Sequence, residues 1–346
     1  MKKKYQEDNR LDRREFVVGT AAAVAGATLV GCSDDDDPNP KKDSGTGTGD
    51  GPGLAAWNVV EVHDPKAMNG KTPDAKRVEA MLASGLTTLA GAKDLPAAWQ
   101  ALLPGFTSSK RIGIKVNCLS HYLYNTTELL AALVKTLVKD LGADAKKIVV
   151  WDRRVDELVR SKITETAVGC PVLGTIKSTS DTSGPGYEPA AVKANGKATH
   201  LSKILTQQTD FTINLPVLKT HGISGVTGAL KNIYGVIDNP GDFHTDLNDY
   251  LPALYALQPI PKHCVLNITE GLLAVTKGDT SDPPDTIASR LIFSADPVAQ
   301  DSHAVALINQ LRGKLKPVPT AKLTWLTNAE KAKLGTTKVT LKQVKL

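Results

Sequence analysis

The fold is decided by residues 111–152, RIGIKVNCLSHYLYNTTELLAALVKTLVKDLGADAKKIVVWD. Residues 111–117 form a short apolar strand, and residues 126–141 repeat apolar side chains at helical spacing up to Gly142. Residues 147–152 form a second apolar strand. Nearly continuous apolar strands that alternate with amphipathic helices are typical of parallel strands buried on both faces. We therefore predict an α/β protein with a mostly parallel sheet and helices on both faces.

The alternation of strand and helix continues along the chain. Hydrophobic residues make up 41% and charged residues 23% of the 346 residues, which excludes global disorder. Asp296 precedes Pro297, a pair that predicts the N-cap and first residue of a helix to about Leu311. We expect further helices over residues 74–89, 155–166 and 245–257 and near residue 229, and strands over residues 210–215, 264–268 and 291–294. These elements make one large domain, residues 54–346, with a small lid or β-insertion at residues 178–197.

The first 32 residues have the features of a bacterial export signal. Arg13 and Arg14 precede a weakly apolar run, residues 17–30, that is too short to span a bilayer of about 30 Å. The arginine pair resembles a twin-arginine signal, which the twin-arginine export machinery reads. Residues 29–32, LVGC, resemble a lipobox, in which Cys32 is acylated and anchors the protein in a membrane. We predict a lipid-anchored protein that faces the periplasm or cell surface; an ordinary N-terminal anchor is the alternative.

Composition limits what the other segments do. Residues 33–53 contain an aspartate run followed by Pro, Lys, Ser, Thr and Gly, which predicts a disordered tether. Beyond Cys32 the chain has Cys118, Cys170 and Cys264 and no C-x-x-C pair, which disfavours an iron–sulfur cluster. Aromatic residues are only 5% of the chain, so a base-stacking surface is not expected and we predict no nucleic-acid partner.

Polar side chains stand at or just after the ends of several predicted strands. Ligands of open α/β sheets bind beyond the carboxyl ends of the strands, so these residues predict a cleft. Ordinary capping chemistry is the alternative. The residues are Lys115, Asn117, His121, Asp152, Arg153, Arg154, Asn214, Lys219, His221, Glu270, Asp296 and Asp301.

Two central stretches, NLPVLKTH at 214–221 and GVTGALKNIYG at 225–235, resemble the domain-of-unknown-function 362 family. Supporting matches are residues 114–117, 148–152 and 294–301, so the resemblance extends over about residues 57–311. It implies one α/β domain and no settled reaction. Many members of that family carry a ferredoxin-like segment, and this chain lacks the cysteines for one.

The glycine-rich stretch predicts an anion site. Gly222, Gly225 and Gly228 precede the helix expected near residue 229, whose first turn would contain Lys231. A helix N-terminus disfavours a cation, so an anion between Lys231 and Lys219 explains the lysine better. A glycine-rich packing turn with Lys231 in solvent is the alternative. We assign ligand binding to Lys115, Asn117, Asn214, Lys219, Thr227, Lys231 and Asn232, and proton transfer to His221 and Asp152.

The scattered acids and histidines allow a second hypothesis, a divalent metal site with Glu270, Asp301 and His244 as its ligands. They match no spacing rule for a metal site. The sequence thus supports an exported lipoprotein whose cleft binds an anionic small molecule, with metal-assisted catalysis as one form of that function. A non-catalytic envelope binding or assembly lipoprotein and a redox cofactor protein are the alternatives.

Overall fold

The strand–helix–strand unit predicted at residues 111–152 forms β4, α3 and β5 in the computed structural model, which describes residues 57–346. β4 (Ile112–Lys115) pairs in parallel with β5 (Ile148–Arg154), and the Thr126 hydroxyl caps α3 (Thr127–Lys139) by accepting from Leu129 N. All four residues of β4 are buried, as expected for a central strand covered on both faces. The export signal, Cys32 and the tether lie outside the described residues.

The remaining strands and helices follow the predicted alternation. The other strands are β1 Val59–His63, β2 Met68–Asn69, β3 Thr72–Pro73, β6 Val172–Ile176, β7 Val192–Ala194, β8 Lys197–Thr199, β9 Phe211–Asn214, β10 Val217–His221, β11 Gly225–Thr227, β12 Cys264–Val275, β13 Thr286–Ser294 and β14 Leu341–Lys345. The other helices are α1 Ala75–Ala90, α2 Leu95–Leu102, α4 Val155–Arg160, α5 Glu165–Val168, α6 Lys203–Gln207, α7 Ala229–Asn232, α8 Leu247–Tyr255, α9 Ile260–His263, α10 Pro297–Leu311 and α11 Thr324–Lys331.

The main sheet runs in the order β14-β1-β13-β12-β9-β4-β5-β6. Strands β12, β9, β4, β5 and β6 run parallel to one another, whereas β13 is antiparallel to both β12 and β1. β12 also pairs in parallel with β10, which carries the antiparallel strand β11. The protein is thus an α/β protein with a mostly parallel open sheet, as predicted.

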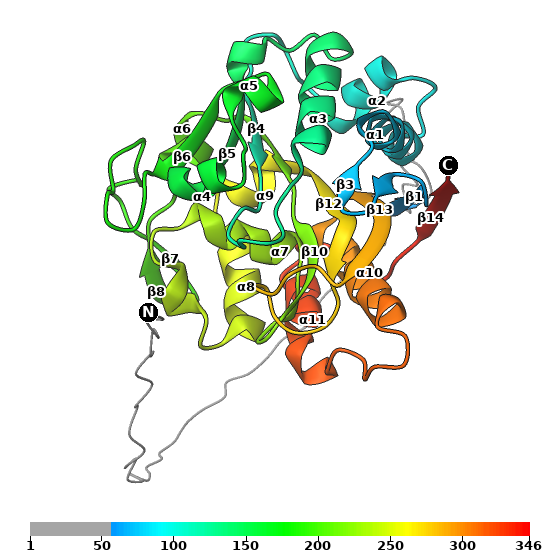
Figure 1. The fold of residues 1–346 in the computed structure, drawn as a ribbon. Coiled ribbons are helices and arrows are strands. Elements are labelled where there is room, and N and C mark those ends of the chain that lie inside the picture. Colours follow the sequence, from blue (N-terminus) through cyan, green and yellow to red (C-terminus); the bar gives the residue numbers. More distant parts are fainter. Residues whose placement is uncertain (1–56) are drawn as a thin grey trace, which may run out of the picture. The chain divides into compact units, whose positions relative to one another are not determined.

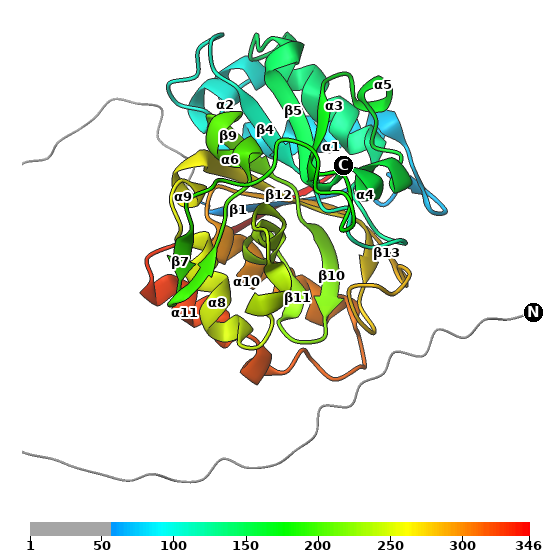
Figure 2. The same cartoon turned by 90° about the vertical axis from the view of Figure 1, so that its left-hand side faces the viewer.

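Helices cover both faces of this sheet (Figure 1). α1, α2 and α3 pack on one face through a core that includes Leu82, Trp99 and Leu133. α7, α8, α10 and α11 pack on the other through a second core that includes Trp325. Figure 2 shows the two groups of helices on opposite sides of β1 and β12.

Two predicted helices differ in detail. The helix expected over residues 155–166 is divided into α4 and α5, and Lys162 between them has a φ of 58°. The helix near residue 229 is only the single turn α7. The insertion at 178–197 leads into the hairpin β7–β8, in agreement with a β-insertion. The Asp296 cap is confirmed, because its carboxylate accepts from Val298 N and Ala299 N.

Cys118, Cys170 and Cys264 are buried free thiols. In residues 57–346, every helix is either too short or too polar to cross a bilayer.

Candidate functional site

A cavity of about 290 Å³ lies where β4, β5 and the β10–β11 hairpin end. We call it the lysine cavity. It is lined by Lys115, Asn117, Leu119, Asp152, Arg153, Arg154, Glu157, Lys219, His221, Thr227, Lys231, Asn232, Tyr234, Gly235, Pro240, His244 and Thr280.

Parallel pairing explains why distant polar residues meet there. β4 lies between β5 and β9, and Lys115 is in register with Trp151 on one side and Asn214 on the other. The carboxyl ends of these strands therefore share one edge of the sheet. β10 pairs with the far half of β12 and carries Lys219 to the same region. His121, in contrast, is exposed and is not part of the cavity lining.

Lys115 and Asp152 form a buried ion pair. The Lys115 Nζ donates to Asp152 Oδ1 at 2.7 Å and to the Val116 carbonyl at 2.7 Å. Asp152 also accepts from Arg153 N, and its Oδ2 accepts from the backbone N and the Sγ of Cys118. All these donors stabilise the carboxylate, and the nearby charge contributes to the raised pKa of the Cys118 thiol, whose main cause is burial. These contacts show that Asp152 holds Lys115 and the Cys118 backbone in place.

A chain of asparagines supports the floor of the cavity. Asn117 Nδ2 donates to Asn232 Oδ1 at 2.9 Å, and Asn232 Nδ2 donates to Asn214 Oδ1 at 2.8 Å. Asn214 Nδ2 in turn donates to Asn267 Oδ1 and to the Ala229 carbonyl, both at 3.0 Å. Asn117 and Asn232 line the cavity, whereas Asn214, predicted to bind ligand, is fully buried and positions Asn232.

Lys219 is the first of two lysines in the cavity that pair with no carboxylate among residues 57–346. It is 1% exposed, and its Nζ donates to Asn117 Oδ1 at 2.9 Å. Burial lowers its pKa to about 8, a shift that the charge of Asp152 opposes. An ammonium has three donors, and this one uses a single donor on a protein acceptor in the described part of the chain.

Lys231 is the second lysine of the cavity that pairs with no carboxylate among residues 57–346. Its Nζ lies 3.2 Å from His244 Nε2 and 3.7 Å from the centre of the Tyr234 ring. Burial, and then the charge of Lys219, lower the pKa of Lys231 to about 7. His244 Nδ1 lies 2.8 Å from the Pro240 carbonyl oxygen, so it donates there, and Nε2 is left as an acceptor for Lys231.

His221 is held in one orientation at the rim. Its Nδ1 accepts from Ile223 N and Ser224 N, both at 3.2 Å, which leaves the proton of the neutral ring on Nε2. Its ring stacks on His244 with 6.1 Å between centroids. Burial, and then the charge of Lys231, lower the pKa of His221 to about 4, so the ring is neutral at pH 7.

The prediction that the glycine-rich turn before residue 229 binds a ligand anion through its backbone N–H groups is wrong. Gly225 belongs to the β10–β11 hairpin, and Gly228 precedes the single turn α7. The backbone N–H groups of Ala229 and Leu230 are already bound by the carboxylate of Asp301, at 2.5 and 3.0 Å. The acceptors at this turn are therefore the carboxyl oxygens of the protein's own Asp301. Lys231 lies in the cavity because of tertiary packing and not because a helix end needs a ligand.

The proposed metal ligands are not brought together. Asp301 is buried under α7, where burial raises its pKa to about 7. His244 lines the lysine cavity, where its Nε2 faces Lys231. Across residues 57–346, no three His, Cys, Asp or Glu side chains are grouped closely enough to hold a metal ion.

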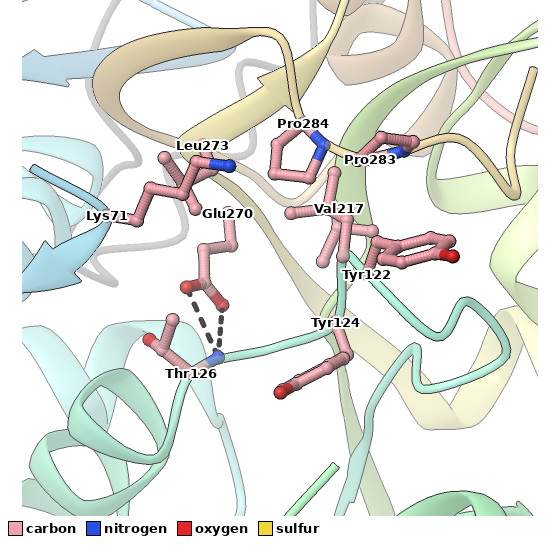
Figure 3. Close-up of a pocket in the computed structure, with 10 residues that line it drawn as sticks. Lys71, Tyr122, Tyr124, Thr126, Val217, Glu270, Leu273, Pro283 and Pro284 are labelled. Carbon is pink, nitrogen blue, oxygen red and sulfur yellow. Dashed lines mark hydrogen bonds between the residues drawn. The ribbon is translucent and has the colours of Figure 1, made fainter. Parts of the chain in front are cut away.

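Glu270, the third expected metal ligand, lines a separate cavity of about 290 Å³, drawn in Figure 3. Its carboxylate accepts from Thr126 N at 3.1 and 3.2 Å and from Asn125 Nδ2 at 3.0 Å. Complete burial raises the pKa of Glu270 to about 7. This carboxyl joins β12 to the start of α3.

Several lining residues were not expected from sequence. Tyr234 lies within the glycine-rich motif at 225–235, but no spacing rule singles it out. Glu157 is on α4, one turn beyond the end of β5, and burial followed by the charge of Asp152 raises its pKa to about 7. Thr280 comes from the loop between β12 and β13. Tyr234 and Glu157 lie within five residues of the assigned Lys231 and Asp152, whereas Thr280 reaches the cavity through long-range packing.

Comparisons with known proteins add a family and a fold. The model of a family described as "Domain of unknown function (DUF362)" matches residues 112–306. Among solved structures, the chain is similar to a crystal structure of a protein from Thermotoga maritima, a structural genomics target, with 13% identity and a TM-score of 0.37. The similarity covers 70% of this chain and 61% of that chain, less than two thirds of its length. No curated protein matches the chain.

Proposed function

Given that the chain belongs to the DUF362 family, whose description assigns no activity, we propose that the lysine cavity binds a small molecule carrying a phosphate or carboxylate group. The family match contains Lys115, Asp152, Lys219 and Lys231, but the proposal rests on their geometry.

The observation that carries it is the pair of unpartnered cations. Lys219 and Lys231 both line the cavity, and no ion pair of either lysine with a carboxylate occurs in the described part of the chain. Removing a charge from water is costly unless a counter-charge replaces the lost hydration. A bound oxyanion would supply that counter-charge, and the remaining ammonium donors could bind its oxygens.

The acids in the cavity lining do not act as counter-charges for Lys219 and Lys231, because each is paired with another cation. Asp152 is paired with Lys115, and Glu157 lies 3.3 Å from Arg154. Arg153 donates to the Asp238 carbonyl and to the Tyr187 hydroxyl, which fixes a further positive charge at the edge. The lining is therefore positive overall and its acids are occupied, as a site for a small anion requires.

Within this proposal, His221 is a hydrogen-bond donor to the bound anion. Its Nδ1 lone pair already accepts from Ile223 N and Ser224 N, so the neutral ring has no free lone pair with which to take a proton. Its Nε2–H has no acceptor among residues 57–346, and in a turnover function it would stabilise negative charge together with Lys219.

Thermal denaturation in phosphate or sulfate tests the proposal. An anion at about 100 times its Kd stabilises the folded state by about 2.7 kcal/mol, which corresponds to a rise of roughly 5–10 °C in Tm. Lys231→Met should lose much of this shift. Lys316→Met should keep it, because Lys316 is an exposed lysine outside the cavity, in the lysine-rich residues 311–346. The shift should also be larger at pH 6 than at pH 9, because Lys219 and Lys231 lose their protons as the pH rises through about 8 and about 7. An equal response of all three proteins would refute the site.

We also propose that the protein is exported and lipid-anchored. Support comes from the order of arginine pair, short apolar run and lipobox in residues 1–32. Cys32→Ser should release the protein from membranes in cell fractionation, and joint Arg13→Lys and Arg14→Lys should block export. Membrane attachment of the Cys32→Ser variant would contradict the anchor.

A further inference from the structure

The surroundings of Lys231 differ from those of every other lysine in the cavity. Lys115 is bound to a carboxylate and Lys219 to an amide oxygen, but the acceptor nearest Lys231 is an imidazole nitrogen. The Pro240 carbonyl fixes the His244 tautomer, so that a lone pair of Nε2 faces the Lys231 Nζ at 3.2 Å. The Tyr234 ring covers another side of the same Nζ at 3.7 Å. A lysine held next to a base in a partly buried cavity has the geometry of an amine nucleophile.

We propose that Lys231 forms an imine with an aldehyde or ketone group of the anionic molecule that the cavity binds. This inference rests on the proposed anion site and adds the class of substrate: a small carbonyl compound with a carboxylate or phosphate group. Lys219, which stays charged to a higher pH, holds the anionic group.

The charge state of Lys231 is consistent with this role. The titratable groups around it are Lys219 and His221 on β10, His244 after the 3-10 turn Pro240–Phe243, and Tyr234. None of them is an acid that would hold the proton on Lys231. With a pKa of about 7, about half of the Lys231 amine is uncharged at neutral pH, against fewer than about one in a thousand for an ordinary lysine.

The step balances without an oxidant or a reductant. The uncharged Nζ attacks the carbonyl carbon, a C–N bond forms, and the π electron pair of the C=O bond moves to oxygen. His244 Nε2 takes one proton from nitrogen and gives it to the alkoxide oxygen, which yields a carbinolamine. The nitrogen lone pair then forms the C=N bond as the C–O bond breaks, and the second nitrogen proton, again carried by His244, leaves with the hydroxyl group as water. One water is released for each imine formed.

Reductive trapping tests the inference on the folded protein. The probe is glyoxylate, an aldehyde with a carboxylate, together with cyanoborohydride, and peptide mass spectrometry locates the carboxymethyl group that results. We expect Lys231 to be labelled more than about tenfold faster than Lys316 at pH 7, because of its larger uncharged fraction. Sulfate should slow the labelling of Lys231 and leave that of Lys316 unchanged. The labelling rate should rise with an apparent pKa near 7.

Lys231→Arg separates the imine from the anion site. Arginine keeps the positive charge, so the variant should still be stabilised by sulfate, but it cannot form an imine and should lose the selective label. His244→Gln keeps a hydrogen-bond acceptor next to Lys231 but removes the base, so it should slow the labelling of Lys231 and leave that of Lys316 at the wild-type rate. Uniform labelling of the lysines in a wild type that responds to sulfate, or a labelling rate that rises only above about pH 9, would overturn the imine alone. Absence of any sulfate response would overturn the anion site itself.

Discussion

Asp152→Asn tests how the lysine cavity is held together. The ion pair of Asp152 with Lys115 has an N–O distance of 2.7 Å, and the two side chains are 7% and 1% exposed. The variant leaves the Lys115 ammonium buried without a counter-charge. The variant also replaces one carboxylate oxygen, which accepts hydrogen bonds, with an amide nitrogen, which donates them. In one orientation this nitrogen faces the donors Lys115 Nζ and Arg153 N, and in the other it faces the two donors of Cys118.

The expected cost is large because one charge of a buried pair remains. Breaking such a pair destabilises a protein by about 3–5 kcal/mol, which for a body of this size lowers Tm by roughly 6–20 °C. Lys115→Met should cost less, because Asp152 then keeps its bonds to Arg153 N and Cys118. The double variant should be more stable than the sum of the two losses predicts, by about 1–3 kcal/mol.

Urea denaturation of the wild type, both single variants and the double variant measures these terms. The matched control is Lys135→Met, which breaks the exposed pair of Lys135 with Glu79, whose N–O distance is 2.6 Å and whose side chains are 55% and 43% exposed. That change should cost less than about 1 kcal/mol. If Asp152→Asn costs no more than Lys135→Met, or if the two cavity substitutions are additive, the pair does not support the cavity as described.

Two further predictions concern the packing around the site. Gly228→Ala places a Cβ 2.1 Å from Asp301 Oδ1, and this carboxyl group cannot move easily because it accepts from Ala229 N and Leu230 N. The variant should therefore lower the free energy of unfolding, measured by denaturant titration, by about 1–3 kcal/mol. Gly241→Ala, whose Cβ meets nothing within 4 Å, should be neutral, and equal losses would contradict the close approach. Burial raises the pKa of Glu270 above its usual 4.5 to about 7, so its stabilising contribution is present below about pH 4.5 and is lost as the pH rises to about 7. The stability of Glu270→Gln relative to wild type should therefore increase over that interval, and a flat difference would show that Glu270 does not titrate there.

The location of the cavity could be predicted from the sequence, because ligands of open α/β sheets bind at the carboxyl ends of the strands. Strand ends such as Lys115 and Asp152 are visible in the sequence, and parallel pairing places them at one edge of the sheet. Most of the residues assigned to ligand binding therefore do line the cavity. The exception is Asn214, which is fully buried and bonded to Asn232 and Asn267.

The position of Lys231 could not be explained from the local sequence. The glycine spacing predicts a helix N-terminus that lacks an anion, but Asp301 on α10 occupies it, from 72 residues further along the chain. A carboxylate in sequence does not reveal whether it faces a metal, a ligand or a backbone N–H group. That choice depends on the direction of the side chain and on what packs against it.

The sequence by itself determined the α/β class, the alternation of elements and the edge of the sheet where polar residues gather, since each depends on short-range periodicity and on the chain direction of parallel strands. Only the tertiary structure decided which charges are neutralised. It paired Asp152 with Lys115, placed Asp301 under α7 and set His244 against Lys231. Within residues 57–346 it left Lys219 and Lys231 without an ion pair to an acid. The physical reason is that desolvation and hydrogen bonding act over a few ångströms between residues that are far apart in the sequence, and only the packed fold establishes those distances.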